Sequence, residues 1–254
     1  MASNSARGRG PAPGPVKREA SVVRPKASQR KGRSNDVGHV ARKPVQKRSR
    51  ERFEAILDAM ERLLEASDIE NISLYDVARE AGLPPASIHY HFPSIAALQI
   101  ELGNRLLETA TAAVLDAQKA LARLRDPSWQ DWLRVMGHHA CDHFNRSRPA
   151  SEVVLAPMLH RESKRAAIAM NDRIGASMLE GLKCVFVVPE VPGLAHRIAL
   201  AADIADMLWS RSYILHGRID DETLEESIRI QIAYLQTVLP ETLPLRRDSD
   251  AGKA

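Results

Sequence analysis

The sequence predicts an all-α fold, and three features support that prediction. Apolar residues recur with the 3.6-residue period of an amphipathic helix in one segment after another. Aromatic residues make up only 4% of the chain, so the core must be aliphatic and rich in Ala, which favours helices over sheets. No segment of useful length alternates polar and apolar residues as a strand does. This pattern predicts about nine helices.

The same patterns divide the chain into four parts. Residues 1–46 contain Gly, Pro, Ser and basic residues, and no aromatic residue precedes Phe53. Such a segment cannot bury enough apolar surface to offset its ordering entropy, so we predict a disordered basic arm there. We expect a three-helix domain over 47–93, a larger helical domain over 94–240 and a disordered tail over 241–254.

Charge is unevenly distributed along the chain. Residues 1–50 contain 14 Lys and Arg against two acidic residues, whereas the remainder contains 22 basic and 30 acidic residues. Basic N-terminal arms often bind nucleic acid through its phosphates. A solvated arm that binds nothing is the alternative.

Composition excludes several classes of protein. The two cysteines, Cys141 and Cys184, are too few for a disulfide scaffold or a zinc-ribbon array, and they suit a reducing cytoplasm. The longest apolar runs, such as Val185–Val188, fall far short of the roughly 18–20 residues that a membrane helix needs. We therefore expect a cytoplasmic protein with no membrane partner.

Two short helices are predicted after a long amphipathic helix that begins near Lys47. Ser73 fits an N-cap with an acidic residue three positions later, and the helix over 74–81 ends at Gly82. A second short helix runs over 85–91, because proline is tolerated at its first position. Two helices joined by a turn with Gly describe a helix-turn-helix, although a plain αα-hairpin in a bundle has the same spacing.

The two faces of the second short helix differ. Ile88 and Phe92 are four residues apart and are expected to face the core. The polar residues Ser87, His89, Tyr90 and His91 remain for a surface that can lie in a major groove roughly 12 Å wide.

This segment resembles the TetR family of bacterial transcriptional regulators over residues 48–106. The resemblance rests on Val77-Ala78-x-x-Ala81-Gly82, on the Ser-Ile-His-Tyr-His-Phe stretch at 87–92 and on residues 94–98. It implies a C-terminal helical domain that binds a small ligand and a homodimer formed by the last two helices. Members of the family mostly repress, and ligand binding releases the DNA.

Three positions depart from the family pattern. Asp68 stands where the family often has Gly, His89 where a Tyr commonly contacts phosphate, and Ile95 where a Lys usually opens the fourth helix. The basic arm, entering beside the DNA, is expected to offset the lost phosphate contact.

The resemblance and the chemistry of DNA recognition together indicate the candidate contacts. The second short helix has no Arg or Lys for guanine, so phosphate contacts should outweigh base readout. Pro85 and Ala86 can contact thymine methyl groups, and Ser73 can bond a phosphate at a helix N-terminus. The candidate DNA-binding residues are Lys47, Arg48, Ser73, Pro85, Ala86, Ser87, His89, Tyr90 and His91.

A predicted helix over 129–146 places His139 and His143 on its apolar stripe. Their spacing, four residues, allows a zinc site, but Cys141 points away and no H-E-x-x-H motif is present. An apolar ligand pocket oriented by the histidines, or core histidines bonded to their neighbours, are the other interpretations. We expect no metal or other cofactor. The candidate ligand-binding residues are Trp132, Met136, His139, His143, Met158 and Met178.

The last two predicted helices, 194–217 and 221–239, carry an Ala-, Leu- and Ile-rich surface. Such a surface suits a two-fold dimer, and packing within one subunit is the alternative. The candidate interface residues are Ala201, Ala205, Leu208, Trp209, Ser212, Leu224, Ile228, Gln231 and Leu235.

The leading hypothesis is a homodimeric repressor that binds double-stranded operator DNA on the bacterial nucleoid and is released by a small-molecule effector. It is not expected to be an enzyme, because the sequence has no Ser-His-Asp signature, P-loop or paired-carboxylate helices. Two alternatives remain: a metal-dependent helical enzyme that uses His139 and His143, and a constitutive DNA-binding protein driven by the basic arm.

Overall fold

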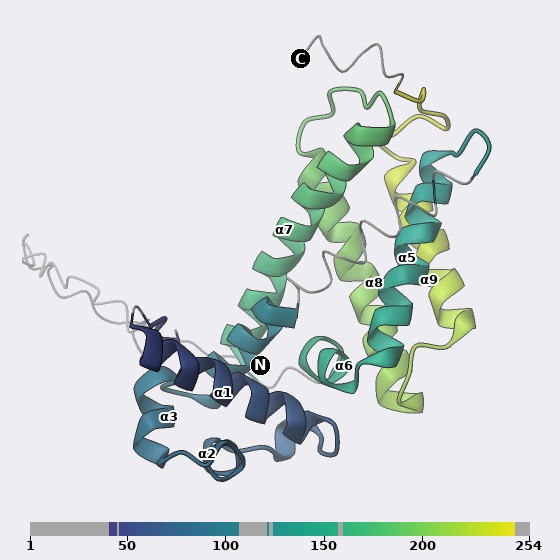
Figure 1. Ribbon diagram of the computed structural model, residues 1–254. Helices are drawn as coiled ribbons and strands as arrows, with labels where there is room; N and C mark the ends of the chain where they lie inside the picture. Colours follow the sequence, from purple (N-terminus) through teal and green to yellow (C-terminus); the bar gives the residue numbers. More distant parts are fainter. Residues whose placement is uncertain (1–40, 45, 107–120, 122–123, 157–159, 247–254) are drawn as a thin grey trace, which may run out of the picture. The chain divides into compact units, whose positions relative to one another are not determined.

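The structure, a computed structural model, describes residues 41–44, 46–106, 121, 124–156 and 160–246. Most of the predicted arm (1–40 and 45) and the end of the predicted tail (247–254) lie outside the described residues. The elements are α1 (Lys47–Leu64), the 3₁₀ helix η2 (Ile69–Asn71), α2 (Leu74–Ala81), α3 (Pro85–His91), α5 (Trp129–Arg146), α6 (Arg148–Val154), α7 (Arg161–Val185), α8 (Leu194–His216) and α9 (Asp221–Leu235) (Figure 1). Residues 95–106 are also helical.

The all-α prediction is confirmed. Within the described ranges, the extended pairing is limited to one isolated antiparallel bridge between Phe186 and Leu245. No helix among the described residues is long and apolar enough to cross a bilayer.

Local signals set the ends of α2 and α3 as predicted. The amide of Ser73 donates to the Asp76 carboxylate at 3.0 Å, and the amide of Asp76 donates to the Ser73 hydroxyl at 3.3 Å, which completes the capping box. Gly82 ends α2 with a φ of 63°, a left-handed conformation that favours glycine. Pro85 occupies the first turn of α3.

Two helix boundaries differ from the prediction. Helical periodicity in the sequence predicts a helix over 151–160, but α6 begins at Arg148 because the Ser147 hydroxyl accepts from the Ala150 amide and Pro149 fits the first turn. The last helix ends at Leu235 and not at residue 239. The four residues after it form turns that lead into Pro240.

The start of the predicted disordered tail is also corrected. Residues 241–246 pack against the end of α7, where the amide of Val187 donates to the Pro244 carbonyl and that of Arg246 to the Val185 carbonyl, both at 2.8 Å. Leu243 is buried. The tail's apolar residues are few, so composition alone did not indicate this pairing.

The N-terminal helices enclose their own core. The apolar face of α1 packs against α2, α3 and the helix over 95–106, and Ile88 and Phe92 are fully buried as predicted. Leu98 and Leu102 belong to this same core. The core therefore extends past residue 93, where the sequence indicated a boundary.

The C-terminal core lies among α5, α7, α8 and α9, which run alongside one another (Figure 1). Helices α7 and α8 approach each other closely at Gly175 of α7. A Cβ atom there would lie 2.7 Å from the amide nitrogen of Ala199 in α8 and would also meet the carbonyl oxygen of Ala195. Glycine is therefore what allows α7 and α8 to pack at this distance.

Candidate DNA-binding surface and ligand cavity

The exposed face of α3 carries most of the residues predicted to read DNA. Pro85, Ala86 and His89 are exposed, and Ser87 is partly buried. The side chain of Tyr90 is 59% exposed. The helix therefore presents small apolar groups at its start and polar aromatic groups at its end.

His91 was predicted to contact DNA, and the structure contradicts this. His91 is only 2% exposed. Its ring packs edge-on against that of Phe53, with 5.8 Å between centroids, and its Nδ1 atom lies 3.5 Å from the Arg42 carbonyl oxygen. Three residues after Ile88, His91 falls on the buried side of α3.

Arg42, which the sequence analysis did not single out, is held beside α3. Its amide donates to the His91 carbonyl at 2.8 Å, and its guanidinium lies 5.8 Å from the centroid of the Tyr90 ring. Lys43 forms an ion pair with Glu101 at 2.8 Å. These contacts fix the chain just before α1, although no periodicity in the sequence signals them.

A second exposed aromatic residue extends this surface onto α2. Tyr75 is 67% exposed, and its ring lies edge-on to that of His89 at 6.3 Å between centroids. Lys47 and Arg48 are exposed at the start of α1. The position of Tyr75, opposite the buried Val77 and Ala78, was the sequence signal that could have identified it.

Ser73 does not offer the phosphate contact that was expected. Both its amide and its hydroxyl donate to the Asp76 carboxylate, at 3.0 and 2.6 Å. The hydrogen bonds from the Ser73 hydroxyl and amide lower the pKa of Asp76, so a negative charge sits at the N-terminus of α2. That charge occupies the position that an anion would need.

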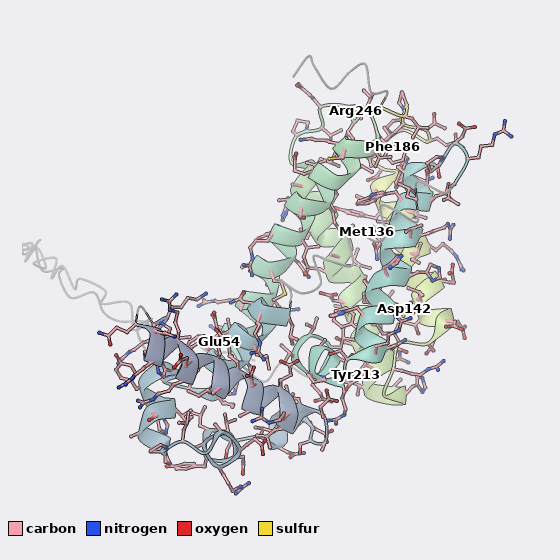
Figure 2. The ribbon with its side chains drawn as sticks, viewed as in Figure 1. Glu54, Met136, Asp142, Phe186, Tyr213 and Arg246 are labelled. Atoms are coloured by element: carbon pink, nitrogen blue, oxygen red, sulfur yellow. The ribbon has the colours of Figure 1, made fainter. Side chains whose placement is uncertain are left out.

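A cavity of about 460 Å³ is lined by α5, α6, α7 and α8, by part of the 95–106 helix, by η2 with Ile72, and by Gln231 of α9. His139 and His143 line it from α5, together with Met136, which is labelled in Figure 2. Met178 lines it from α7. Burial lowers the pKa of His143, which favours its neutral form.

One predicted ligand-binding residue, Trp132, is absent from the described lining of the cavity. Trp132 is 4% exposed and belongs to the C-terminal core beneath the cavity. It sits on the edge of the α5 stripe that packs into that core. Met158 lies outside the described residues.

Several acidic and amide residues of the wall, among them Asp206, Glu152 and Asn171, were not predicted from the sequence. The Asn171 side chain donates at 2.8 Å to both Asp203 and Asp206. Burial raises the pKa of Asp206 to about 6, the hydrogen bond from Asn171 opposes the rise, and the nearby Asp203 charge adds to it. These residues lie on different helices, so no local motif indicates them.

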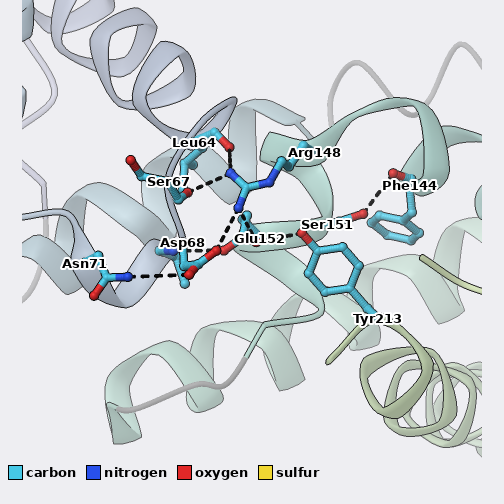
Figure 3. A network of polar contacts seen from close by, with 10 residues as sticks. Leu64, Ser67, Asp68, Asn71, Phe144, Arg148, Ser151, Glu152 and Tyr213 are labelled. Carbon is cyan, nitrogen blue, oxygen red and sulfur yellow. Dashed lines mark hydrogen bonds and ion pairs between the residues drawn. The ribbon is translucent and has the colours of Figure 1, made fainter. Parts of the chain in front are cut away.

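A polar network connects the end of α1 to α6 and α8 (Figure 3). The Arg148 guanidinium donates to the Leu64 and Ser67 carbonyls and pairs with Asp68 at 2.7 Å. Asp68, which stands where the family often has Gly, therefore has a structural partner. Arg148 also lies 3.5 Å from the buried Glu152.

Glu152 occupies the centre of this network. Its carboxylate accepts the Ile69 amide at 2.8 Å and the Tyr213 hydroxyl at 2.6 Å (Figure 3). Burial and the bond to Glu152 raise the pKa of Tyr213, which therefore remains a donor. Glu152 also lines the cavity, so the network reaches from the cavity wall to α1.

Most residues predicted to form a dimer interface are buried inside one subunit. Trp209 donates to the Ser227 hydroxyl at 2.9 Å, and Ser212 bonds to Asp220 at 2.7 Å. The sequence could not distinguish apolar residues that face α7 from those that face a partner. Those buried within the subunit are Ala201, Ala205, Trp209, Ser212, Leu224, Ile228, Gln231 and Leu235.

The apolar residues that α8 leaves exposed are different ones. Leu200, Met207 and Ile214 follow one another at seven-residue intervals and are 38%, 74% and 56% exposed. Leu215 beside them is 59% exposed, and the predicted Leu208 is partly buried. Spacing of seven places these side chains on one face of the helix.

The other candidate metal ligands are separated. His138 points away from the cavity and lies 3.1 Å from Glu225, and burial raises the pKa of Cys141 to about 11. No group of three or more potential metal ligands occurs among the residues that the structure describes.

An exposed helix after a glycine turn, basic residues beside it and a second group of helices with a cavity are features typical of helix-turn-helix proteins. Residues 56–102 match the family model of bacterial regulatory proteins of the tetR family. Residues 56–102 are therefore similar to the DNA-binding domain of the TetR family.

Solved structures show the same fold. A TetR-family transcriptional regulator from Streptomyces coelicolor is 21% identical, with a TM-score of 0.55 over 75% of this chain and 99% of that one. A TetR-family regulator from Rhodococcus sp. RHA1 is 15% identical, with a TM-score of 0.52 over 73% and 96%.

FadR from Thermus thermophilus, a TetR-family repressor solved in complex with lauroyl-CoA, is 19% identical, with a TM-score of 0.51 over 71% and 93% of the two chains. No curated protein matches the chain significantly in sequence.

Proposed function

We propose that this protein is a sequence-specific DNA-binding repressor that leaves its operator when a small apolar molecule fills the cavity. The observation that carries the proposal is the surface of α3, where Tyr90 is 59% exposed and Arg42 is held against its ring. We propose regulation and not metal-dependent catalysis, because the cavity histidines belong to no group of three potential metal ligands in the described part of the chain.

In this proposal α3 enters the major groove. His89 and Tyr90 reach base edges or phosphates, and Pro85 and Ala86 approach thymine methyl groups. Arg42, Lys47 and Arg48 contact the phosphate backbone, and Ser87 and Tyr75 extend the contacts at either side. With no Lys or Arg on α3 itself, phosphate contacts supply most of the affinity.

A second copy of the chain covers the exposed apolar face of α8. Leu200, Met207, Ile214 and Leu215 form a continuous stripe, whereas isolated exposed apolar residues are common and need no partner. A two-fold dimer through this stripe brings two α3 helices to one DNA duplex. This interface replaces the one predicted from the buried residues of α8 and α9.

The cavity is the effector site in this proposal. Its volume of about 460 Å³ lies within the range of roughly 300–1,000 Å³ that small-molecule sites have. Met136 and Met178 adapt to an apolar body, and His139 and His143 orient it through hydrogen bonds. The Thermus repressor bound to lauroyl-CoA supports a ligand with a large apolar part.

The Arg148–Glu152 network provides the connection between the two sites. A ligand that displaces α6 would change the distance from Glu152 to the Ile69 amide and from Arg148 to the Ser67 carbonyl. Both acceptor and donor groups lie directly after α1, which packs against α2 and α3. A change at the cavity wall is thereby transmitted to the DNA-binding helices through contacting groups.

Replacing Tyr90 with Ala tests the DNA-binding surface. We expect affinity for the operator, selected from random DNA with the wild-type protein, to fall about tenfold or more if the ring reads a base. Affinity for random DNA should change less, and the melting temperature should stay the same because Tyr90 is mostly exposed. The readouts are fluorescence anisotropy on both DNAs and thermal unfolding.

The Tyr90→Phe variant is the matched control, since it keeps the ring beside Arg42 and removes only the hydroxyl. Equal losses on operator and random DNA would assign Tyr90 to a phosphate. Full operator binding by a stably folded Tyr90→Ala protein would exclude the contact altogether.

A further inference from the structure

We propose that the cavity takes an apolar cation, an amphiphile whose positively charged head pairs with Asp206. This inference rests on the proposed function, in which the cavity is the effector site. The inference specifies the sign of the charge on the ligand, which the fold alone does not determine.

Asp206 is a carboxylate on the cavity wall without a positively charged partner among the described residues. Its carboxylate accepts a hydrogen bond from the Asn171 side chain at 2.8 Å, and Lys164 acts on it through its charge without forming an ion pair. The two amide bonds of Asn171 both go to carboxylates, Asp203 and Asp206, so that amide has no further hydrogen to donate. The remaining lone pairs of Asp206 are open to a donor from a ligand.

Of the other acidic and basic residues that line the wall, Glu70 is exposed, and Glu152 and Arg173 are hydrogen-bonded. Glu152 accepts from Ile69 and Tyr213, and Arg173 donates to Asn104 at 2.8 Å. We therefore take the Asp206 carboxylate, which is not exposed and has no ion pair among the described residues, as the group that selects the charge of a ligand. An anionic ligand would be repelled by it, and a neutral ligand would leave a desolvated carboxylate unpaired, which costs free energy.

Aromatic groups lie beside Asp206. Trp209 is three residues further along α8 and lines the cavity, so the two side chains share one face of the helix. Phe144 also lines the cavity and packs edge-on against Trp209, with 5.9 Å between centroids. The faces of aromatic rings attract cations, so acid and rings favour the same ligand head.

Three probes with the same ten-carbon chain separate charge from apolar burial: decylammonium, decanol and decanoate. Binding to the full-length wild-type protein is measured by isothermal titration calorimetry at neutral pH. We expect decylammonium to bind at least tenfold more tightly than decanol, and decanoate to bind most weakly. In the same series, only decylammonium should release the operator at low concentration.

The decisive variant is Asp206→Asn, and Asp203→Asn is its matched control. Asp203 accepts from the same Asn171 amide but does not line the cavity. Asp206→Asn should abolish the preference for decylammonium over decanol, whereas Asp203→Asn should keep it. Asp206→Asn should remain folded and be at least as stable as the wild type without ligand, because it removes a desolvated charge.

The outcomes separate this inference from the proposed function. If decanol or decanoate binds the protein and causes it to release the operator, while decylammonium does not, the cavity is still an effector site but the cation assignment is wrong. Equal preference for decylammonium in Asp206→Asn and wild type would also overturn the assignment. If no probe binds the wild type, both the cation assignment and the apolar effector site fail, while DNA binding through α3 is unaffected.

Discussion

Replacing Arg148 with Ala is expected to lower the free energy of unfolding by about 3 kcal/mol, the typical cost of removing one partner of a buried ion pair. The variant leaves Glu152, whose side chain is 5% exposed, without its cation. It also removes the donors to the Leu64 and Ser67 carbonyls and the pair with Asp68. Urea denaturation followed by circular dichroism gives the free energy.

Arg146 provides the matched control two positions away. It pairs with Asp142 four residues earlier, at side-chain exposures of 79% and 61%. Such an exposed pair contributes about 0.5 kcal/mol at most, so Arg146→Ala should be nearly neutral. Equal stability of the two variants would show that the network around Arg148 does not hold the end of α1.

Replacing Gly175 with Ala should lower the free energy of unfolding by about 2–3 kcal/mol, because the added Cβ meets the backbone of α8. Its distances, 2.7 Å to the Ala199 nitrogen and 2.9 Å to the Ala199 Cβ, cannot be relieved by rotating a side chain. Alanine favours helix over glycine by about 1 kcal/mol, which offsets only part of the clash. Thermal and urea unfolding measure the result.

Gly103 is the control for this substitution, since it is also a helical glycine. A Cβ there would lie 3.3 Å from the tip of Val153 and 3.5 Å from that of Met170, and both tips can move. Gly103→Ala should therefore be close to neutral or mildly stabilising. If Gly175→Ala is equally well tolerated, α7 and α8 do not pack as closely as described.

The DNA-binding helices were predictable because short-range signals determine them. The Ser73 cap, the left-handed Gly82 and Pro85 at the first turn act within a few residues, and the observed bounds of α1, α2 and α3 follow them. Local signals gave a wrong prediction where a hydrogen-bond donor already has an acceptor within the protein. They predicted a phosphate contact for Ser73, whose hydrogens go to Asp76.

The helical character of the larger domain could be predicted from the sequence, but the contacts between its helices could not. Periodicity places His139 and His143 on one stripe of α5, and both line the cavity. It cannot show that Asp206, from α8, meets Asn171 of α7, because that pairing depends on how helices pack. The buried Trp209 and the exposed Met207 illustrate the same limit, since both are apolar residues of one helix.

The spacing and symmetry of the DNA site show whether the protein binds DNA as a dimer that recognises a specific sequence. The measurement is hydroxyl-radical footprinting of the full-length protein on an operator selected from random DNA. We expect two protected half-sites related by near two-fold symmetry, with centres about 34–36 Å apart or a multiple of one helical turn, as two α3 helices of a dimer require. Protection that spreads along any DNA without a preferred sequence, or a single isolated half-site, would contradict a dimeric, sequence-reading repressor.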